Sequence, residues 1–368
     1  MNELLYCLWL SRIKGIGCER AMDIYEKFGS FEAVYNADKP ALCGIRGIKD
    51  SMIDEIMKKD TSGAYDIMEK CEKEDIRIIP VFDENFPERL KHIFSPPLIL
   101  YTKGAEVNFN EIAPVTIVGS RRPSDYGCKM SFKIGYELAQ AGAVVVSGMA
   151  RGVDSLSQRG AIKAGGITVA VLGTGCETAY PAENRDLKEL IENNGCVISE
   201  YSPGMMALPS NFPRRNRIMS GLSAAVVFIE GEKNSGTLIT ARCALEQGRD
   251  VFCLPGNIDN PLSYAPNMLM KEGAYVMTDA SDVIEALNRE YDTELLESAA
   301  ETHMENAAAL LPPEQKEIVS LLSRKTPVHI DEICSGCSLD TAKITQNLML
   351  LEIGGMVKSM PGRYYLLK

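Results

Sequence analysis

The fold is decided by residues 115–147, which read VTIVGSRRPSDYGCKMSFKIGYELAQAGAVVVS. The segment begins with a continuous apolar run, Val115–Gly119, and ends with another, Ala143–Ser147. Such runs are typical of strands that are buried on both faces of a sheet. Between them, Ile134 and Leu138 recur at the spacing of an amphipathic helix. The segment therefore predicts a strand–helix–strand unit whose two strands are parallel.

The same alternation of buried strands and amphipathic helices extends over residues 115–290. Glycines such as Gly165 and Gly195 close several of the intervening helices, as a left-handed capping residue does. Repeated β–α units predict an α/β fold with a parallel, doubly wound sheet, which binds ligands at the carboxyl ends of its strands. The further strand patterns lie at Ile167–Leu172, Cys196–Glu200, Ala224–Glu230, Asp250–Leu254 and Ala274–Met277.

The composition shifts along the chain and predicts four parts. Residues 1–75 are helical in pattern, and residues 76–290 form the α/β domain. The first part of that domain, up to residue 114, reads as a proline-rich connector with one short strand. Residues 291–310 are acidic and alanine-rich, which indicates a linker, and residues 311–368 form a small terminal unit.

The charge of the chain is unevenly distributed. Its 368 residues include 39 basic and 50 acidic ones, and this net charge of −11 by itself argues against a nucleic-acid partner. Residues 201–229, however, contain no acid and carry three arginines. Because salt screens charges beyond about 8 Å, a local basic patch matters more to a polyanion than the global sum.

Cysteine usage and hydropathy predict a cytoplasmic protein without a membrane anchor. The eleven cysteines, an odd number, are scattered and lie mostly in apolar runs, as buried thiols of a reducing compartment do. No apolar run approaches 18 residues, and Leu4–Leu10 lacks the basic flank of a signal peptide. Cys334 and Cys337 form a lone CxxC pair with no histidine at ligand spacing, so no metal site is expected.

Two predicted strand ends carry an arginine among small residues. In Gly119-Ser120-Arg121, glycine allows the backbone to approach a ligand, free amides at the helix start attract anions, and arginine can bind a phosphate through two nitrogens. The alternative is a plain β–α turn with a surface arginine. The second strand end, residues 147–154 (SGMARGVD), likewise places an arginine, Arg151, just after a predicted strand. Asp154 in this segment could instead cap the next helix.

The densest cluster is residues 211–217, NFPRRNR, within the acid-free stretch. Arginines this dense need partners, and no nearby acid in the sequence supplies one. The pattern favours a groove that follows a nucleic-acid backbone and stacks a base on Phe212. The alternative is a solvated helix face with a phenylalanine in the core.

A fourth turn, Ser235-Gly236-Thr237, also lies between a strand and a helix and has the form of a phosphate-binding turn. Thr237 stands where a Walker A motif requires lysine, so that motif is excluded. Gly173-Thr174-Gly175 lacks the third glycine of a dinucleotide fingerprint, so no nicotinamide cofactor is expected.

The sequence offers no catalytic constellation. The three histidines lie outside the strand-end loops, so a Ser-His-Asp arrangement has no natural candidate. Glu200 and Glu230, at two strand ends, are the obvious acid–base options. We therefore expect a non-enzymatic protein with no catalytic residues and no cofactor.

Several of these segments together resemble the DNA-processing protein A family (DprA, also called Smf), over roughly residues 80–290. The arginine–asparagine–arginine block is the specific part of this resemblance. The matching segments occur in one order: VGSR (118–121), SGMARGVD (147–154), YP (180–181), SEY (199–201), FPRRNRIMSGLS (212–223), SGTLITA (235–241) and LPGN (254–257).

The resemblance implies an extended Rossmann-like domain that binds single-stranded DNA, protects incoming strands in natural transformation and loads the recombinase RecA. It also implies a homodimer. Arg121 is expected to hold a phosphate and Phe212 to contact a base, while Gly236 and Thr237 shape the pocket. The candidate DNA-binding residues are Gly119, Ser120, Arg121, Arg151, Phe212, Arg214, Arg215, Asn216, Arg217, Ser235, Gly236 and Thr237.

Two departures and one rival class qualify this reading. The family's alanine–histidine pair is Ser157-Gln158 here, and Ala265 replaces a glycine near the end of the sheet. The rival is a nucleotide-hydrolysing enzyme, because phosphoribohydrolases of the same superfamily carry a related glycine–threonine loop. Such an enzyme needs a catalytic glutamate soon after that loop, and Glu246 is the nearest.

The flanking regions agree with the resemblance. Residues 10–25 read as two helices joined by a Gly15-Ile16-Gly17 hairpin, and residues 44–56 echo this pattern. A helix-hairpin-helix or sterile-alpha-motif-like domain of this kind can bind phosphates through backbone amides or serve packing alone. Residues 311–368 suggest a winged helix with Ser338 as a helix cap. Its third helix would present Lys343, Gln346 and Asn347 to a major groove, or else bind protein.

Overall fold

The computed structural model describes residues 2–45, 47–291, 311–323, 326–353 and 356–367. The chain divides into two compact units, residues 1–301 and 302–368. Most of the predicted acidic linker, residues 292–310, lies outside the described residues, so the predicted domain boundaries stay predictions.

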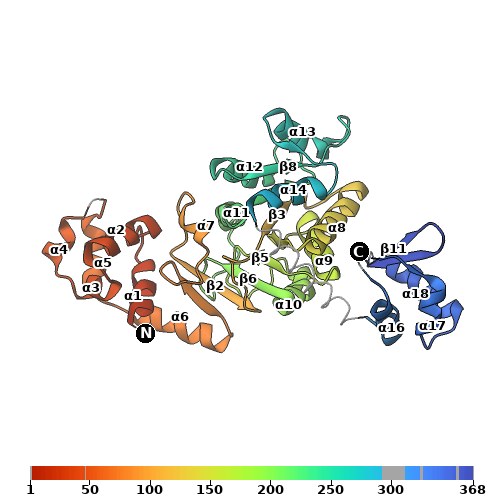
Figure 1. Ribbon diagram of the computed structural model, residues 1–368. Helices are drawn as coiled ribbons and strands as arrows, with labels where there is room; N and C mark the ends of the chain where they lie inside the picture. Colours follow the sequence, from red (N-terminus) through yellow and green to blue (C-terminus); the bar gives the residue numbers. More distant parts are fainter. Residues whose placement is uncertain (1, 46, 292–310, 324–325, 354–355, 368) are drawn as a thin grey trace. The chain divides into compact units, whose positions relative to one another are not determined.

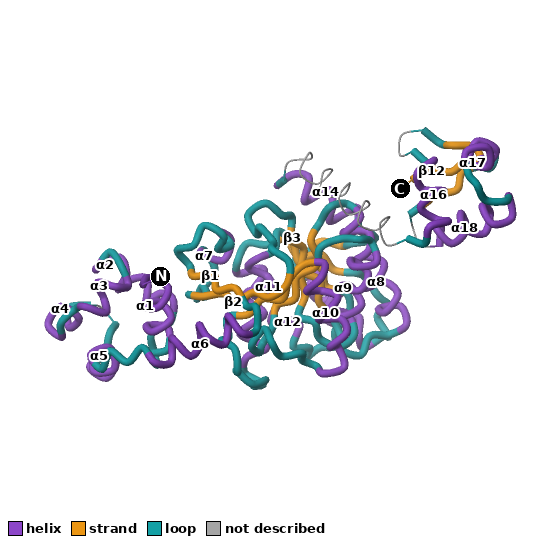
Figure 2. The backbone as a smooth tube through the Cα atoms, turned by 90° about the horizontal axis from the view of Figure 1, so that it is seen from below, coloured by secondary structure: helices purple, strands orange, loops and turns teal. Residues whose placement is uncertain are grey.

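A nine-stranded sheet forms the centre of the first unit. Figures 1 and 2 show its strands lying among the surrounding helices. Its order is β1-β2-β6-β5-β4-β3-β7-β8-β9, and the strands from β6 to β9 are parallel. This mostly parallel sheet confirms the predicted fold class. The strands are β1 (Arg77–Pro80), β2 (Ile99–Gly104), β3 (Pro114–Val118), β4 (Val144–Ser147), β5 (Thr168–Val171), β6 (Gly195–Ser199), β7 (Ala225–Phe228), β8 (Asp250–Cys253) and β9 (Tyr275–Val276).

Helices pack on both faces of the sheet because its strands are apolar on both sides. Val115 and Ile117 of β3 belong to one buried cluster with side chains of α8, α9 and α14. Val118 points to the other face and packs with α11 and α12. The helices of this domain are α7 (Glu88–Lys91), α8 (Asp125–Gln140), α9 (Val153–Lys163), α10 (Arg185–Asn194), α11 (Asn211–Leu222), α12 (Thr237–Glu246), α13 (Tyr264–Lys271) and α14 (Ser281–Glu290), with short 3-10 turns at Ala182–Asn184 and Pro261–Ser263.

One edge of the sheet departs from the prediction. The connector over residues 76–114 contains two complete strands, β1 and β2, rather than one, and β2 begins two residues after Pro97. Strand β2 pairs antiparallel with both β1 and β6. The two prolines favour a loop in the sequence, so the apolar run that follows them was not predicted to be a strand. Without this strand the buried β6 would be an edge.

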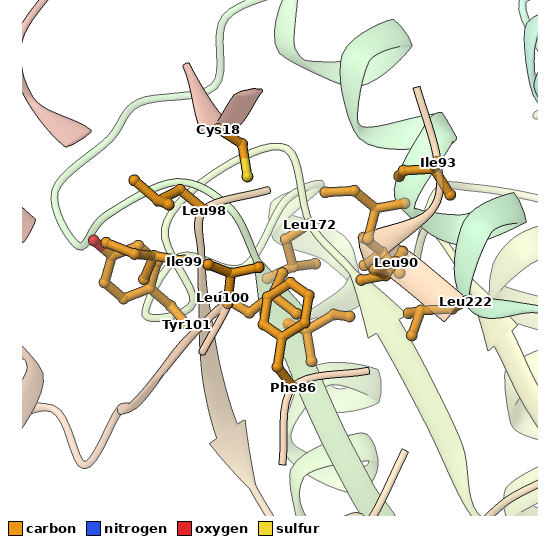
Figure 3. Close-up of a cluster of buried hydrophobic side chains, with 14 of the residues drawn as sticks. Cys18, Phe86, Leu90, Ile93, Leu98, Ile99, Leu100, Tyr101, Leu172 and Leu222 are labelled. Carbon is orange, nitrogen blue, oxygen red and sulfur yellow. The ribbon is translucent and has the colours of Figure 1, made fainter. Parts of the chain in front are cut away.

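The N-terminal helices share a hydrophobic core with this edge of the sheet. In Figure 3, Cys18 at the start of α2 lies in a buried cluster with Leu98, Leu100 and Phe86. The expected hairpin connects α1 to α2, and its Gly15 has a φ of 94°, which favours glycine. These helices are α1 (Asn2–Ser11), α2 (Cys18–Phe28), α3 (Phe31–Asn36), α4 (Lys39–Cys43), α5 (Asp50–Met57) and α6 (Ser62–Lys73).

The second unit has the helix and strand order of a winged helix around its own apolar cluster. Its elements are α16 (Pro313–Leu321), β10 (Val328–His329), α17 (Ile330–Gly336), α18 (Thr341–Ile353), β11 (Val357–Met360) and β12 (Tyr364–Leu367).

Two details of this unit correct the prediction. Asp340, and not Ser338, accepts the first-turn amide of Lys343 in α18, at 2.9 Å. Asn347 is buried and Lys343 pairs with Glu314, with 3.1 Å between Nζ and Oε1. Asn347 is therefore not available on the face expected to enter a major groove, whereas Lys343 and Gln346 remain exposed there.

Candidate functional site

A cavity of about 660 Å³ lies at the carboxyl ends of β3, β4 and β7. The chain leaves β3 for β4 on one side, whereas β7 pairs with β3 on the other. This reversal of strand order is the point where doubly wound sheets bind their ligands. The cavity lining is Val118, Gly119, Ser120, Arg121, Arg122, Ala150, Asp154, Tyr180, Ala207, Pro209, Phe212, Pro213, Arg215, Asn216, Met219, Glu232, Asn234, Ser235, Gly236, Thr237, Ile239 and Thr240.

The loop after β3 brings two free cations to the cavity. Arg121 and Arg122 are both exposed, and within the described residues neither has an acidic partner. The backbone amide of Arg122 donates to the Ser120 hydroxyl at 3.0 Å, which fixes the turn. Arginines in this state are available to an anionic ligand such as a phosphate.

A buried carboxylate holds the start of the next helix. Glu230, at 2 % exposure, accepts hydrogen bonds from the Ser124 amide at 2.9 Å and the Ser124 hydroxyl at 2.5 Å. Ser124 in turn caps α8, because its hydroxyl accepts from the amide of Gly127. Glu230 therefore anchors the end of the segment that carries Arg121 and Arg122.

An aromatic pair forms another wall of the cavity. The rings of Phe212 and Tyr180 have centroids 5.0 Å apart and are tilted by 32°. Tyr180 is 44 % exposed, so the pair presents apolar surface to a ligand. A Cβ atom at Gly173 would approach the Phe212 ring to 3.0 Å, so the glycine makes room for this ring.

Arg215 lies in the cavity wall but is almost fully buried, at 4 % exposure. Its Nη1 donates to the carbonyl oxygens of Gly148, at 3.0 Å, and of Val171. The guanidinium thus joins the ends of β4 and β5 to α11. Burial lowers the pKa of Arg215 to about 10, although the nearby Asp154 opposes this shift. Its contacts are those of a structural residue.

Asp154 supports the loop that precedes its helix rather than capping that helix. Its Oδ2 accepts the amides of Gly148 at 3.1 Å and of Ala150 at 3.4 Å, both of which come before α9. The alternative that Asp154 caps α9 is therefore wrong, because Gly152 is the residue at the N-cap position. Burial raises the pKa of Asp154, while Arg215 and these two amides oppose that shift.

The other predicted arginines lie outside the cavity lining. Arg217 is bonded to Glu200, and Arg151 is bonded to Glu183 with 2.8 Å between Nη2 and Oε2. The sequence offered no nearby acid for the arginines of residues 211–217, but the fold brings Glu200 to Arg217 from outside that stretch. Arg151 is likewise paired with an acid that is distant in the sequence. Arg214 is exposed and has no acidic partner in the described part of the chain.

The turn after β7 forms a further part of the cavity wall. Ser235, Gly236 and Thr237 all line it, and the Ser235 and Thr237 hydroxyls are hydrogen-bonded to each other. The neighbouring Asn234 and Glu232 were not predicted. Nor was Tyr180, although it belongs to a tyrosine–proline pair that contributed to the resemblance.

None of the three glutamates considered for catalysis lines the cavity. Glu230 is bonded to Ser124, Glu200 to Arg217, and Glu246 is exposed at the end of α12. The two departures from the family pattern also lie outside the lining. Gln158 is buried and donates to the Val169 carbonyl at 3.2 Å, and Ala265 is buried.

The described ranges contain no group of three or more histidine, cysteine or carboxylate side chains placed to hold a metal ion. Nor is any helix there long and apolar enough to cross a membrane.

Two glycines near the cavity are expected to respond differently to alanine. Gly152 has a φ of 75°, and a Cβ there would lie 2.4 Å from the Ser120 carbonyl oxygen. A Cβ at Gly236 would meet nothing within 4 Å. Gly152→Ala should therefore cost about 1–3 kcal/mol of unfolding free energy, and Gly236→Ala should stay within about 0.5 kcal/mol. Urea unfolding of both variants tests this, and equal midpoints would contradict it.

Comparison with known proteins identifies matches over most of the chain. The family model for DNA recombination-mediator protein A matches residues 77–288, and the DprA winged helix domain model matches residues 302–363. Protein Smf of Synechocystis is 31% identical over 99% of this chain and 98% of its own. DNA processing protein DprA of Streptococcus pneumoniae is 40% identical over 55% of this chain and 72% of its own.

Solved structures agree with these matches. The X-ray structure of DNA processing protein A from Streptococcus pneumoniae has a TM-score of 0.66 at 31% identity, and covers 76% of this chain and 97% of its own. A structure of the Helicobacter pylori protein, which concerns that protein's single-stranded DNA binding mode, has a TM-score of 0.53 at 29% identity. It covers 59% of this chain and 97% of its own.

Proposed function

This chain belongs to the DprA/Smf family of DNA recombination-mediator proteins, and from that premise we propose that it binds single-stranded DNA in the cavity at the switch point of its sheet. The observation that carries the proposal is that one cavity holds both the aromatic pair Tyr180–Phe212 and two arginines, Arg121 and Arg122, which have no acidic partner among the described residues. Arginines hold a phosphate backbone and aromatic rings stack unpaired bases.

The roles of the predicted residues divide between contact and support. Arg121 holds a phosphate, Phe212 stacks a base, and Ser120, Ser235 and Thr237 offer polar groups around them. The turns at Gly119 and Gly236 let the backbone approach the strand. Exposed Arg214 extends the basic surface beyond the cavity, whereas Arg151, Arg215 and Arg217 position the loops that line it.

The remaining parts of the proposal follow from the family. The protein protects incoming strands in natural transformation and loads the recombinase RecA on them, as a cytoplasmic homodimer without catalytic activity. We divide the protein into four parts: a helical domain (1–75), a Rossmann-like domain (76–290), a linker (291–310) and a winged helix (311–368). RecA loading is tested by RecA ATPase activity on single strands coated with single-strand binding protein, which this protein should restore.

Fluorescence anisotropy tests the binding itself. The full chain is titrated into a labelled oligothymidine, and into a duplex of equal length, at two salt concentrations. We expect preference for the single strand and an affinity that falls steeply with salt. Absence of binding at low salt would overturn the proposal, and release of free base from a nucleoside monophosphate would favour the hydrolase instead.

A further inference from the structure

The helix α11 presents three side chains to the cavity at helical spacing. Phe212, Asn216 and Met219 all line it and follow one another four and three residues apart. Residues at this spacing lie next to each other on one face of a helix. The carboxamide of Asn216 is therefore one turn away from the aromatic ring of Phe212.

The carboxamide of Asn216 is held in one orientation. The residue is only 9 % exposed, and its Oδ1 accepts a hydrogen bond from Arg215 Nε at 3.2 Å. A guanidinium N–H can donate but not accept, so the oxygen and not the nitrogen faces it. Arg215 is itself fixed by the carbonyl oxygens of Gly148 and Val171.

The nitrogen of the same amide is left without a partner. Among the described residues nothing accepts from Asn216 Nδ2, and this atom is not one of the enclosed, unbonded side-chain atoms. A nearly buried donor that still reaches a cavity is available to an acceptor on a ligand. The cations that would hold phosphate, Arg121 and Arg122, are on a different loop, after β3.

We propose that Asn216 determines base specificity by donating from Nδ2 to a carbonyl oxygen of the base stacked on Phe212. This inference rests on the proposed binding of single-stranded DNA. The base class it favours is one with an exocyclic carbonyl: thymine, cytosine or guanine. Its position relative to Phe212 supports a base edge, rather than a phosphate, as the acceptor.

The experiment compares two oligonucleotides that differ in hydrogen bonding but not in shape. One is oligothymidine, and the other carries 2,4-difluorotoluene in place of each thymine, which keeps the ring and size but accepts hydrogen bonds poorly. The full chain should bind oligothymidine about 3- to 10-fold more tightly, the range of one neutral hydrogen bond. Equal affinity would overturn the inference while leaving the proposed function intact, whereas failure to bind either oligonucleotide would sink the proposed function.

The variant Asn216→Asp tests whether the difference in affinity between the two oligonucleotides comes from the Asn216 side chain. Asn216→Asp keeps an acceptor for Arg215 Nε but removes the Nδ2 donor. Its preference for oligothymidine over the difluorotoluene strand should fall to near 1. Asn193→Asp, at the end of α10, makes the same charge change at an exposed position outside the cavity and should keep the wild-type ratio. An unchanged ratio in Asn216→Asp would contradict the proposal, whatever the absolute affinities.

Discussion

Arg215→Ala is expected to lower the free energy of unfolding by about 3–5 kcal/mol, the cost of breaking a buried charged contact. The substitution leaves the carbonyl oxygens of Gly148 and Val171 without their donor. It also removes the cation whose charge stabilises the buried Asp154 carboxylate. Two strand ends and α11 lose their common link, so the cavity wall itself should loosen.

The neighbouring arginine is a matched control. Arg214 differs from Arg215 by one position in α11 but is exposed and has no acidic partner within the described residues. Arg214→Ala should therefore change stability by no more than about 0.5 kcal/mol. Denaturant unfolding followed by circular dichroism measures both variants. If Arg215→Ala unfolds at the same midpoint as Arg214→Ala, the structural role assigned to Arg215 is wrong.

The difference between these two arginines could have been found in the sequence. Ile218 and Leu222 mark the buried face of α11, and Arg215 and Asn211 lie seven and eleven residues before Leu222, about two and three helical turns back on the same face. Both are buried in the structure. The number of arginines in this stretch does not show which of them is buried, because it says nothing about the helix face on which each one lies.

Other features of the site depend on contacts that are distant in sequence. The parallel sheet and the cavity at its strand ends were predictable, because buried β–α units repeat and glycine-containing turns follow β3, β4 and β7. The partners of Arg217 and Arg151 were not, since Glu200 and Glu183 lie 17 and 32 positions away. The strand β2 was missed for a local reason, namely the two prolines before it.

Arg121→Ala is expected to reduce the affinity for oligothymidine by about 10- to 100-fold, the range of a charge-assisted hydrogen bond of about 1.5–3 kcal/mol. The guanidinium is exposed at the cavity and forms no ion pair with an acid in the described part of the chain. Its longer-range interactions with Asp154 and Arg215 have opposite signs. Stability should consequently change little, in contrast to Arg215→Ala.

The salt dependence of binding separates a phosphate contact from a general loss of structure. If Arg121 neutralises one phosphate, the slope of log affinity against log salt should become shallower by about 0.7 in Arg121→Ala. Arg159→Ala is a suitable control, because Arg159 lies on α9 outside the cavity and pairs with Asp186 at 2.7 Å. It should leave both affinity and slope near the wild type. An Arg121→Ala protein that is folded and binds with unchanged slope would place the phosphate elsewhere, for instance at Arg122 or Arg214, which also lack an acidic partner among the described residues.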